Sequence, residues 1–302
     1  MSPPTFIRNL LALALLASLA ACGPGGQIKL PFKLPFKLPG GPDIGFDKDA
    51  LENAIDGGFG GIGTCVVIDD ARSGRETYRY NTYGVCSNKM PPCQTYEIAG
   101  DLMGLDAGLV DPAAKVKWDG TPQPLSSWQH DMDLKTAFQD SVGWWQARIA
   151  QNLGQDGVKQ QLKRLGYGNG DVGSSLSSFW MGPSQGGQLG ISTSEQAGFL
   201  HRLYAGQLPV KPATAQAVQQ LMVDETRGGS TISGKGGDCA TLSDSSRMVA
   251  WYVGRLSSGA HDWTFAVSLE GDSKNALPGI ELQHRVKSAF AQAGLWPAAS
   301  SE

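Results

Sequence analysis

A serine and a lysine that are close enough in the sequence to act together occur at Ser233 and Lys235. Two strand residues separated by one position point to the same face, so their side chains can meet. A lysine amine that removes the proton from a serine hydroxyl turns that hydroxyl into a nucleophile. The pair therefore predicts one route to serine hydrolase chemistry, although a serine beside a lysine is common in any fold.

The sequence contains no motif for binding a metal, a nucleotide or a nucleic acid. The net charge is −3, and no long run of basic residues suggests a nucleic-acid partner. No glycine-rich phosphate loop or dinucleotide fingerprint is present, so we expect no cofactor. The histidines are scattered without the spacing of metal ligands, so we expect no metal site: His130, His201, His261 and His284.

Residues 1–21 predict an export signal. Arg8 precedes an apolar run that is too short to span a bilayer, which needs about 20 residues. The run ends in Leu-Ala-Ala-Cys, which resembles a bacterial lipobox, so we expect cleavage before Cys22 and a lipid anchor on its thiol. An ordinary secretory signal or an uncleaved one remains the alternative. Gly23 after the cysteine favours the periplasmic face of the outer membrane.

Residues 22–46 predict an extended tether between the lipid and the folded domain. The segment repeats Lys-Leu-Pro-Phe, and a proline at every fourth position blocks both helix and central strand. Such a chain is partly polyproline-like and sets a distance from the membrane. Phe32 and Phe36 could contact lipid or a partner, but a plain spacer is the simpler interpretation.

Residues 47–302 predict one α+β domain. Strand-like runs lie near both ends of this region and helical patterns lie between them, so an antiparallel sheet formed by N- and C-terminal strands should pack against a helical body. The expected elements are a helix at 47–57, a hairpin with strands at 65–68 and 77–80, a helical body at 94–225, strands at 247–256 and 262–271, and a helix at 280–296.

Two stripes are expected on the helix that begins the helical body. An apolar stripe with helical spacing predicts its core face, and a glycine stripe predicts close approach of a second helix. The apolar stripe comprises Ile98, Leu102, Leu105 and Leu109, and the glycine stripe comprises Gly100, Gly104 and Gly108.

Seven segments, in order and at fitting distances, resemble the class D β-lactamases. This serine penicillin-recognising fold also occurs in β-lactam sensor domains, and the resemblance spans residues 61 to 295. It implies that fold and a cleft built for penicillin-like ligands. The matching segments are Gly-Thr-Cys-Val-Val-Ile-Asp at 63–69, Lys-Trp-Asp-Gly at 117–120, 140–146, Tyr-Gly-Asn at 167–169, 179–200, Ser-Gly-Lys-Gly-Gly at 233–237 and Trp-Tyr-Val-Gly at 251–254.

The nucleophile motif of that family is altered in this chain. The family reads Pro-Ala-Ser-Thr-Phe-Lys-Ile, whereas residues 92–98 read Pro-Cys-Gln-Thr-Tyr-Glu-Ile. Gln94 thus stands where the resemblance implies the serine, and Glu97 stands where it implies the lysine whose carbamate is the base. A glutamine amide cannot form an acyl-enzyme ester. No lysine in the chain has a serine three residues before it, so no second Ser-x-x-Lys motif exists.

Other parts of the implied cleft are retained or partly changed. The resemblance places Ser141, Lys235 and Gly237 in the cleft, although the Thr of the family's Lys-Thr-Gly is Gly236 here. The hydroxyl that would hold a substrate carboxylate is therefore missing. Ser141 and Lys235 form a second pair that could carry relocated chemistry.

Glu97 has two interpretations. Trp180 matches the family tryptophan that hydrogen-bonds the lysine carbamate, so Glu97 could supply the negative charge of that carbamate on a shorter stem. Alternatively, Glu97 is simply an acidic residue in a first helical turn, where the helix dipole favours it.

Four cysteines remain once Cys22 is assigned to the lipid, and in an exported chain they predict two disulfides with three pairings. In the resembled fold the positions of Cys93 and Cys239 face each other across the cleft. The resemblance therefore implies Cys93–Cys239, which leaves Cys65–Cys86. A local Cys86–Cys93 bridge stays open as the alternative.

These features favour a lipoprotein of the cell envelope without catalytic activity. Its cleft would bind a peptidoglycan peptide or another envelope protein. A divergent serine hydrolase that uses a relocated Ser/Lys pair is the alternative, and a structural component of an envelope assembly is a third hypothesis that the sequence does not separate from the first.

Overall fold

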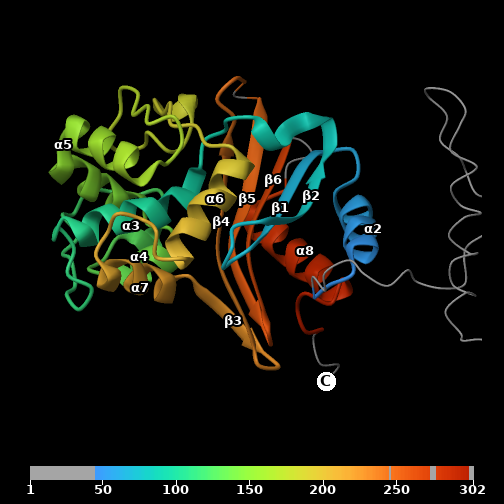
Figure 1. The fold of residues 1–302 in the computed structure, drawn as a ribbon. Helices are drawn as coiled ribbons and strands as arrows, with labels where there is room; N and C mark the ends of the chain where they lie inside the picture. Colours follow the sequence, from blue (N-terminus) through green and yellow to red (C-terminus); the bar gives the residue numbers. More distant parts are fainter. Residues whose placement is uncertain (1–44, 245, 273–276, 299–302) are drawn as a thin grey trace, which may run out of the picture. The chain divides into compact units, whose positions relative to one another are not determined.

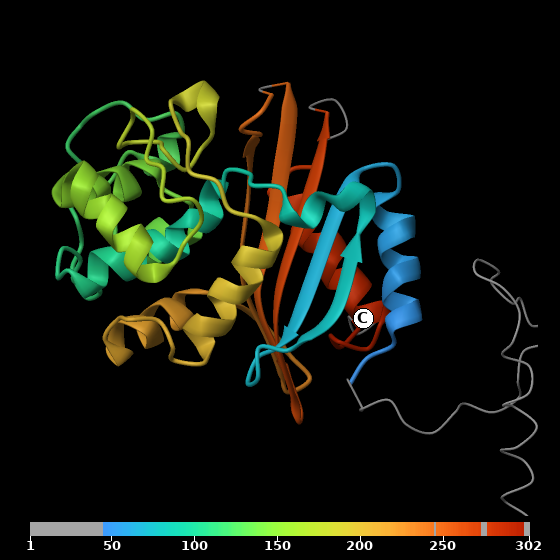
Figure 2. The same cartoon turned by 45° about the horizontal axis from the view of Figure 1, so that its top comes forward.

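The computed structural model describes residues 45–244, 246–272 and 277–298. Its centre is a six-stranded antiparallel sheet in the order β2-β1-β6-β5-β4-β3 (Figures 1 and 2). The strands are β1 (Gly63–Asp70), β2 (Glu76–Asn81), β3 (Val223–Arg227), β4 (Ser230–Ala240), β5 (Arg247–Ser258) and β6 (His261–Asp272).

Helices cover both faces of this sheet. On one face α8 lies against β5 and α2 packs on α8. On the other face α6 lies against β1 and β6, and the remaining helices lie on the same side of the sheet (Figure 1). The helices are α2 (Lys48–Phe59), α3 (Tyr96–Asp106), α4 (Leu134–Gln139), α5 (Gly143–Leu165), α6 (Thr193–Tyr204), α7 (Pro212–Leu221) and α8 (Gly279–Gln292).

The sheet joins the two ends of the domain, as predicted. β1 pairs with β6 over its whole length, from Gly63 opposite Glu270 to Asp70 opposite Trp263. Every strand is antiparallel to its neighbours. This arrangement confirms the α+β fold class.

Two predicted boundaries differ from the structure. Phe46, placed at the end of the tether, packs edge-on against Tyr78 and Trp263, so the packed domain includes it. The helical body does not reach Glu225, because α7 ends at Leu221 and the chain turns back as β3 to pair with β4. The sequence of β3 did not predict a strand, because β3 is short and follows α7 directly.

The helix after Gln94 is also shorter than its apolar stripe suggested. α3 ends at Asp106, and Gly108 adopts a left-handed φ of 71°. The chain leaves the helix there, so Leu109 is 42 % exposed instead of continuing the core stripe. The glycine stripe holds for its first two members, since Gly100 faces Gln146 and Gly104 faces Ile149 on α5.

The export signal, Cys22 and the tether as far as residue 44 lie outside the described residues. Among the residues that are described, no helix is both long enough and apolar enough to cross a bilayer. The same residues contain no group of three or more side chains placed to hold a metal ion.

Candidate functional site

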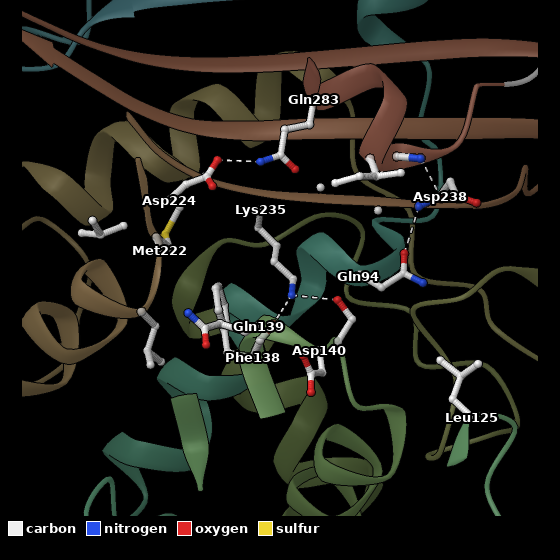
Figure 3. Close-up of a pocket in the computed structure, with 18 of the residues that line it drawn as sticks. Gln94, Leu125, Phe138, Gln139, Asp140, Met222, Asp224, Lys235, Asp238 and Gln283 are labelled. Carbon is white, nitrogen blue, oxygen red and sulfur yellow. Dashed lines mark hydrogen bonds between the residues drawn. The ribbon is translucent and has the colours of Figure 1, made fainter. Parts of the chain in front are cut away.

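Gln94 lies in a tight turn at the start of α3. Cys93 has a left-handed φ of 51°, and its N–H donates to the backbone oxygen of Trp180 at 2.9 Å. This conformation directs the Gln94 side chain toward β4. There its Oε1 accepts a hydrogen bond of 2.9 Å from the backbone N–H of Asp238 (Figure 3).

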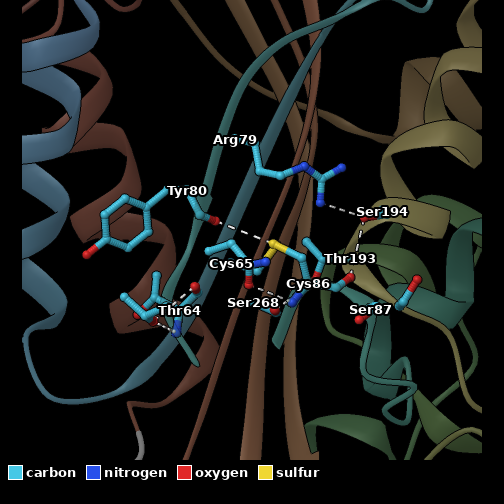
Figure 4. The surroundings of a disulfide bond; sticks show 12 residues. Thr64, Cys65, Arg79, Tyr80, Cys86, Ser87, Thr193, Ser194 and Ser268 are labelled. Atoms are coloured by element: carbon cyan, nitrogen blue, oxygen red, sulfur yellow. Dashed lines mark hydrogen bonds between the residues drawn. A yellow bond between two sulfur atoms is a disulfide. The ribbon is translucent and has the colours of Figure 1, made fainter. Parts of the chain in front are cut away.

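Two disulfides hold the surroundings of this turn, and they are the pairs implied by the resemblance. Cys93–Cys239 joins the start of α3 to β4 with a Cα–Cα distance of 5.7 Å. Cys65–Cys86 joins β1 to the segment after β2, where Thr193 and Ser268 also meet at 2.7 Å (Figure 4). The alternative Cys86–Cys93 bridge is not formed.

Lys235 is the buried cation of the site. Its Nζ lies 2.8 Å from Glu97 Oε2 and donates to Ser141 Oγ at 2.8 Å and to the backbone oxygen of Phe138. Lys235 is 6 % exposed and Glu97 is 2 % exposed. The Lys235 nitrogen thus has an ion-pair contact with Glu97 and hydrogen bonds to two further oxygen atoms.

A second carboxyl group lies behind Glu97. Asp101, one helical turn further along α3, is completely buried and accepts a hydrogen bond of 2.8 Å from Gln146 Nε2. Burial raises the pKa of Glu97 to about 7, although Lys235 opposes the shift. Burial, followed by the charge of Glu97, raises the pKa of Asp101 to about 8. One lysine thus faces two carboxyl groups, and a proton on Asp101 balances the charge.

Gly100 makes room for this arrangement. A Cβ atom at Gly100 would lie 2.0 Å from Gln146 Oε1. The absence of a side chain there allows α5 to approach α3 closely enough for Gln146 to reach Asp101. The glycine was predicted as a packing feature, but the buried acid–amide pair that it permits was missed.

Trp180 and Glu97 have different partners. The Trp180 ring stacks on Tyr96 with centroids 4.9 Å apart, whereas the Glu97 carboxylate faces Lys235. Glu97 therefore supplies a negative charge to the cleft lysine, and its side chain is directed at Lys235 from the first turn of α3.

The structure brings only one of the two predicted Ser/Lys pairs into contact. Ser141 meets Lys235, and Ser141 has an unusual left-handed φ of 54°. Ser233 lies on the same face of β4 but next to the hydroxyl of Tyr204. Only the Ser141–Lys235 pair is brought into contact.

A cleft of about 590 Å³ opens in front of these residues (Figure 3). Gln94, Ser141, Lys235 and Gly237 line it, as the resemblance implied. The sequence did not single out the remaining polar and apolar lining, because it comes from turns and helix ends scattered along the chain. The carboxylates are Asp140, Asp224 and Asp238, and the exposed apolar side chains are Leu125, Val223 and Ile280.

The edge of β4 forms one wall of the cleft. β3 pairs with β4 only up to Ser233. Beyond that point the N–H of Gly234 donates to the Met222 oxygen and the N–H of Asp238 donates to Gln94. Alternate residues of a strand point their backbone groups to the same edge, so Gly236 presents its N–H and C=O to the cleft.

Comparisons with known proteins agree with this geometry. The model of the penicillin binding protein transpeptidase domain matches residues 63–283. The β-lactamase OXA-5 of Pseudomonas aeruginosa is 32 % identical over 188 residues, which cover 62 % of this chain and 69 % of that protein. OXA-1 of Escherichia coli is 30 % identical over 222 residues, covering 71 % and 78 %.

Solved structures give the same relationship. The BPu1 β-lactamase superimposes with a TM-score of 0.70 at 26 % identity, covering 81 % of this chain and 98 % of that one. The class D β-lactamase FUS-1 of Fusobacterium nucleatum superimposes with a TM-score of 0.70 at 25 % identity, covering 81 % and 97 %.

Proposed function

Since this chain belongs to the penicillin-recognising family that includes the class D β-lactamases, we propose that it is a lipid-anchored envelope protein that binds peptides in its cleft without being acylated. The ligand is a peptidoglycan peptide or an extended segment of another envelope protein. The anchor is the lipid on Cys22, and the protein faces the periplasm from the outer membrane.

The contact between Gln94 and Asp238 carries this proposal. At the position where the resemblance implies a serine nucleophile, the chain has an amide whose oxygen occupies a backbone donor of β4. Glu97 pairs with Lys235, and Ser141 and the Phe138 oxygen contact the same nitrogen, so the lysine is engaged by three partners in a structural role. These contacts support a cleft that is kept in shape without its covalent chemistry.

The lining of the cleft favours a peptide. The edge of β4 at Gly236 can pair with an extended chain, and backbone pairing at an open strand edge is a common mode of peptide recognition. Exposed Leu125, Val223 and Ile280 at the cleft offer contacts for apolar side chains.

Incubation with a reactive penicillin, followed by intact-mass spectrometry, tests the absence of acylation. We expect no added mass. A stable adduct would refute the non-acylating function, and peptide mapping would then locate it. An adduct on Ser141 would support the divergent hydrolase, which the Ser141–Lys235 contact favours.

Thermal-shift and calorimetric titrations with synthetic stem peptides test the binding function. We expect saturable binding, and we expect Gln94→Ala to bind more tightly because it frees the Asp238 N–H for the ligand. Gln292→Ala, at an exposed position on α8, is the matched control and should bind as the unchanged protein does. Absence of binding to every stem peptide would leave an envelope protein as the ligand to be tested by crosslinking at Leu125.

A further inference from the structure

A second cavity of about 600 Å³ lies beside the cleft. Its walls are the segment from Lys117 to Trp128 and the beginning of α5. Trp128 lines both this cavity and the cleft, so the two hollows adjoin at this residue. Neither the Ser/Lys chemistry nor the Gln94 contact involves the second cavity.

The α5 wall is one face of a helix. Trp144, Ala147, Arg148 and Gln151 all line the cavity. Their spacing of three, four and seven residues places them on a single stripe. Ala147 is small and buried, which leaves a hollow between the indole of Trp144 and the polar side chains of Arg148 and Gln151.

The two indoles are fixed in place by their own N–H groups. Trp144 Nε1 donates to the backbone oxygen of Trp128 at 2.8 Å. Trp128 Nε1 donates to the backbone oxygen of Asp140 at 3.1 Å. Both rings remain only partly buried. Since the N–H groups are already used, each ring offers a ligand its apolar surface.

Planar polar groups surround these rings. Asp119, Gln123, Arg148 and Gln151 line the cavity and supply both donors and acceptors. Local hydrogen bonds hold three of them: Asp119 Oδ1 accepts from Thr121 N at 2.8 Å, Gln123 Nε2 donates to the Thr121 oxygen at 3.1 Å, and Arg148 donates to the Lys117 oxygen at 3.3 Å.

The aromatic and polar side chains of the cavity together favour some classes of ligand over others. A purely apolar ligand would leave the polar groups of the rim unpaired, which is unfavourable. A cationic ligand would meet Lys117 and Arg148 against the single carboxylate of Asp119. A sugar ring has a face of C–H groups that packs on an indole and an edge of hydroxyl groups that exchange hydrogen bonds with amide, carboxylate and guanidinium groups.

We infer that this second cavity is a saccharide-binding site, with the ligand packed against Trp144 and Trp128 and hydrogen-bonded by Asp119, Gln123, Arg148 and Gln151. Because Trp128 also borders the cleft, a sugar joined to a peptide can occupy both hollows at once. That last extension rests on the proposed peptide-binding function, whereas the sugar site itself does not.

Calorimetric titration and tryptophan fluorescence of the full protein test the site with three probes. These are an oligomer of N-acetylglucosamine, a stem peptide without sugar, and a muropeptide in which sugar and peptide are joined. A glucose oligomer serves as a fourth probe that separates bacterial-wall sugars from saccharides in general. We expect the N-acetylglucosamine oligomer to bind, and the muropeptide to bind more tightly than either part.

Variants assign the binding to the cavity. Trp144→Ala should weaken sugar binding by about tenfold or more and leave stem-peptide binding unchanged, since a buried aromatic contact is worth about that factor. Gln151→Ala, at an exposed position, should weaken sugar binding without affecting the fold. Tyr83→Ala is the control, because Tyr83 is an exposed aromatic residue that does not line this cavity.

The outcomes separate this site from the proposed function. Sugar binding without stem-peptide binding supports the saccharide site and contradicts a peptidoglycan peptide as the ligand of the cleft. Peptide binding without any oligosaccharide binding overturns the saccharide site. The saccharide site is also overturned if neither Trp144→Ala nor Gln151→Ala weakens sugar binding. It is overturned as well if the cavity binds a proline-rich peptide with the sequence of residues 27–42 in preference to a sugar.

Discussion

The two faces of the sheet are held together by different means. The face under α2 and α8 packs apolar side chains such as Leu51, Phe265 and Phe290. The opposite face also has an apolar core, but both disulfides lie on it, together with the buried Glu97, Asp101 and Lys235. Buried charges are costly even when paired. These three side chains lie on the face that carries the cleft, where the proposed ligand-binding function would give them a role beyond stability.

Removal of the Cys93–Cys239 bridge is the change with the largest expected effect. The double variant Cys93→Ala/Cys239→Ala should lose about 5 kcal/mol of unfolding free energy, because the bridge closes a loop with a sequence separation of 146. Cys65→Ala/Cys86→Ala, with a separation of 21, should lose only about 3 kcal/mol. Denaturant unfolding measures both. Equal losses would show that loop length does not govern the difference.

Truncation of one aromatic residue on each face compares the two cores directly. Phe290→Ala and Phe179→Ala should each lose about 3–5 kcal/mol, since both rings are buried and pack edge-on against aromatic neighbours. Only Phe179→Ala should also weaken ligand binding, because Phe179 contacts Trp180 and Tyr96 beside the cleft. A binding defect in Phe290→Ala would contradict the division between the faces.

Removal of the charge on Glu97 should cost about 3 kcal/mol, because Glu97→Gln leaves the Lys235 ammonium buried without a counter-ion. The double variant Glu97→Gln/Lys235→Met removes both charges, so its loss should be smaller than the sum of the single losses. Chemical denaturation of the four proteins completes the cycle. Additive losses would mean that the two side chains do not interact.

Per unit of pH, the smallest expected effect is on the pH dependence of stability. The raised pKa of Asp101 means that the folded protein keeps this proton to a higher pH than the unfolded chain does. The contribution of Asp101 to the free energy of unfolding therefore falls as pH rises from about 4 to about 8, by at most about 1.4 kcal/mol per pH unit. Glu97, whose pKa burial raises to about 7, adds a fall of the same sign up to that pH.

Asp101→Asn removes this titration but keeps an oxygen that can accept from Gln146. Its unfolding free energy, measured in urea at a series of pH values, should change less steeply over the same range. Asp156→Asn, an exposed change on α5, is the control and should keep the original slope. If the unfolding free energy of Asp101→Asn depends on pH as steeply as that of the unchanged protein, then Asp101 is ionised in the folded protein and the prediction is wrong.

Much of the fold was predictable, because local patterns reflect local structure. The β-rich run at 65–68 and the apolar runs after Arg247 predicted strands that the structure contains. The capping box of Ser192 and Glu195, which begins α6, is a further local signal of this kind. β3 was missed because its five residues gain their strand structure from pairing with β4. Leu109 was misplaced because the left-handed turn at Gly108 ends the periodicity.

The sequence predicted which residues form the candidate site, but not which of them contact each other. Family resemblance assigned Gln94, Glu97 and Lys235 to one cleft, and it implied both disulfides. The partnership of Glu97 with Lys235, the acid–amide pair of Asp101 with Gln146, and the cavity between Trp128 and Trp144 had no signal in the sequence. Each depends on how two helices, or a helix and a strand, approach each other.

The sequence by itself determined which chemistry is present. It lacks Ser-x-x-Lys, and it places an amide and a carboxylate at the two positions where the family has its nucleophile and base. The tertiary structure alone decided what those groups do. The register of β4 brings Asp238 to Gln94 across 144 residues of chain, and the Cys93–Cys239 bridge holds that approach. Hydrogen bonds and ion pairs act only over a few ångströms, so packing, not sequence proximity, made these residues partners.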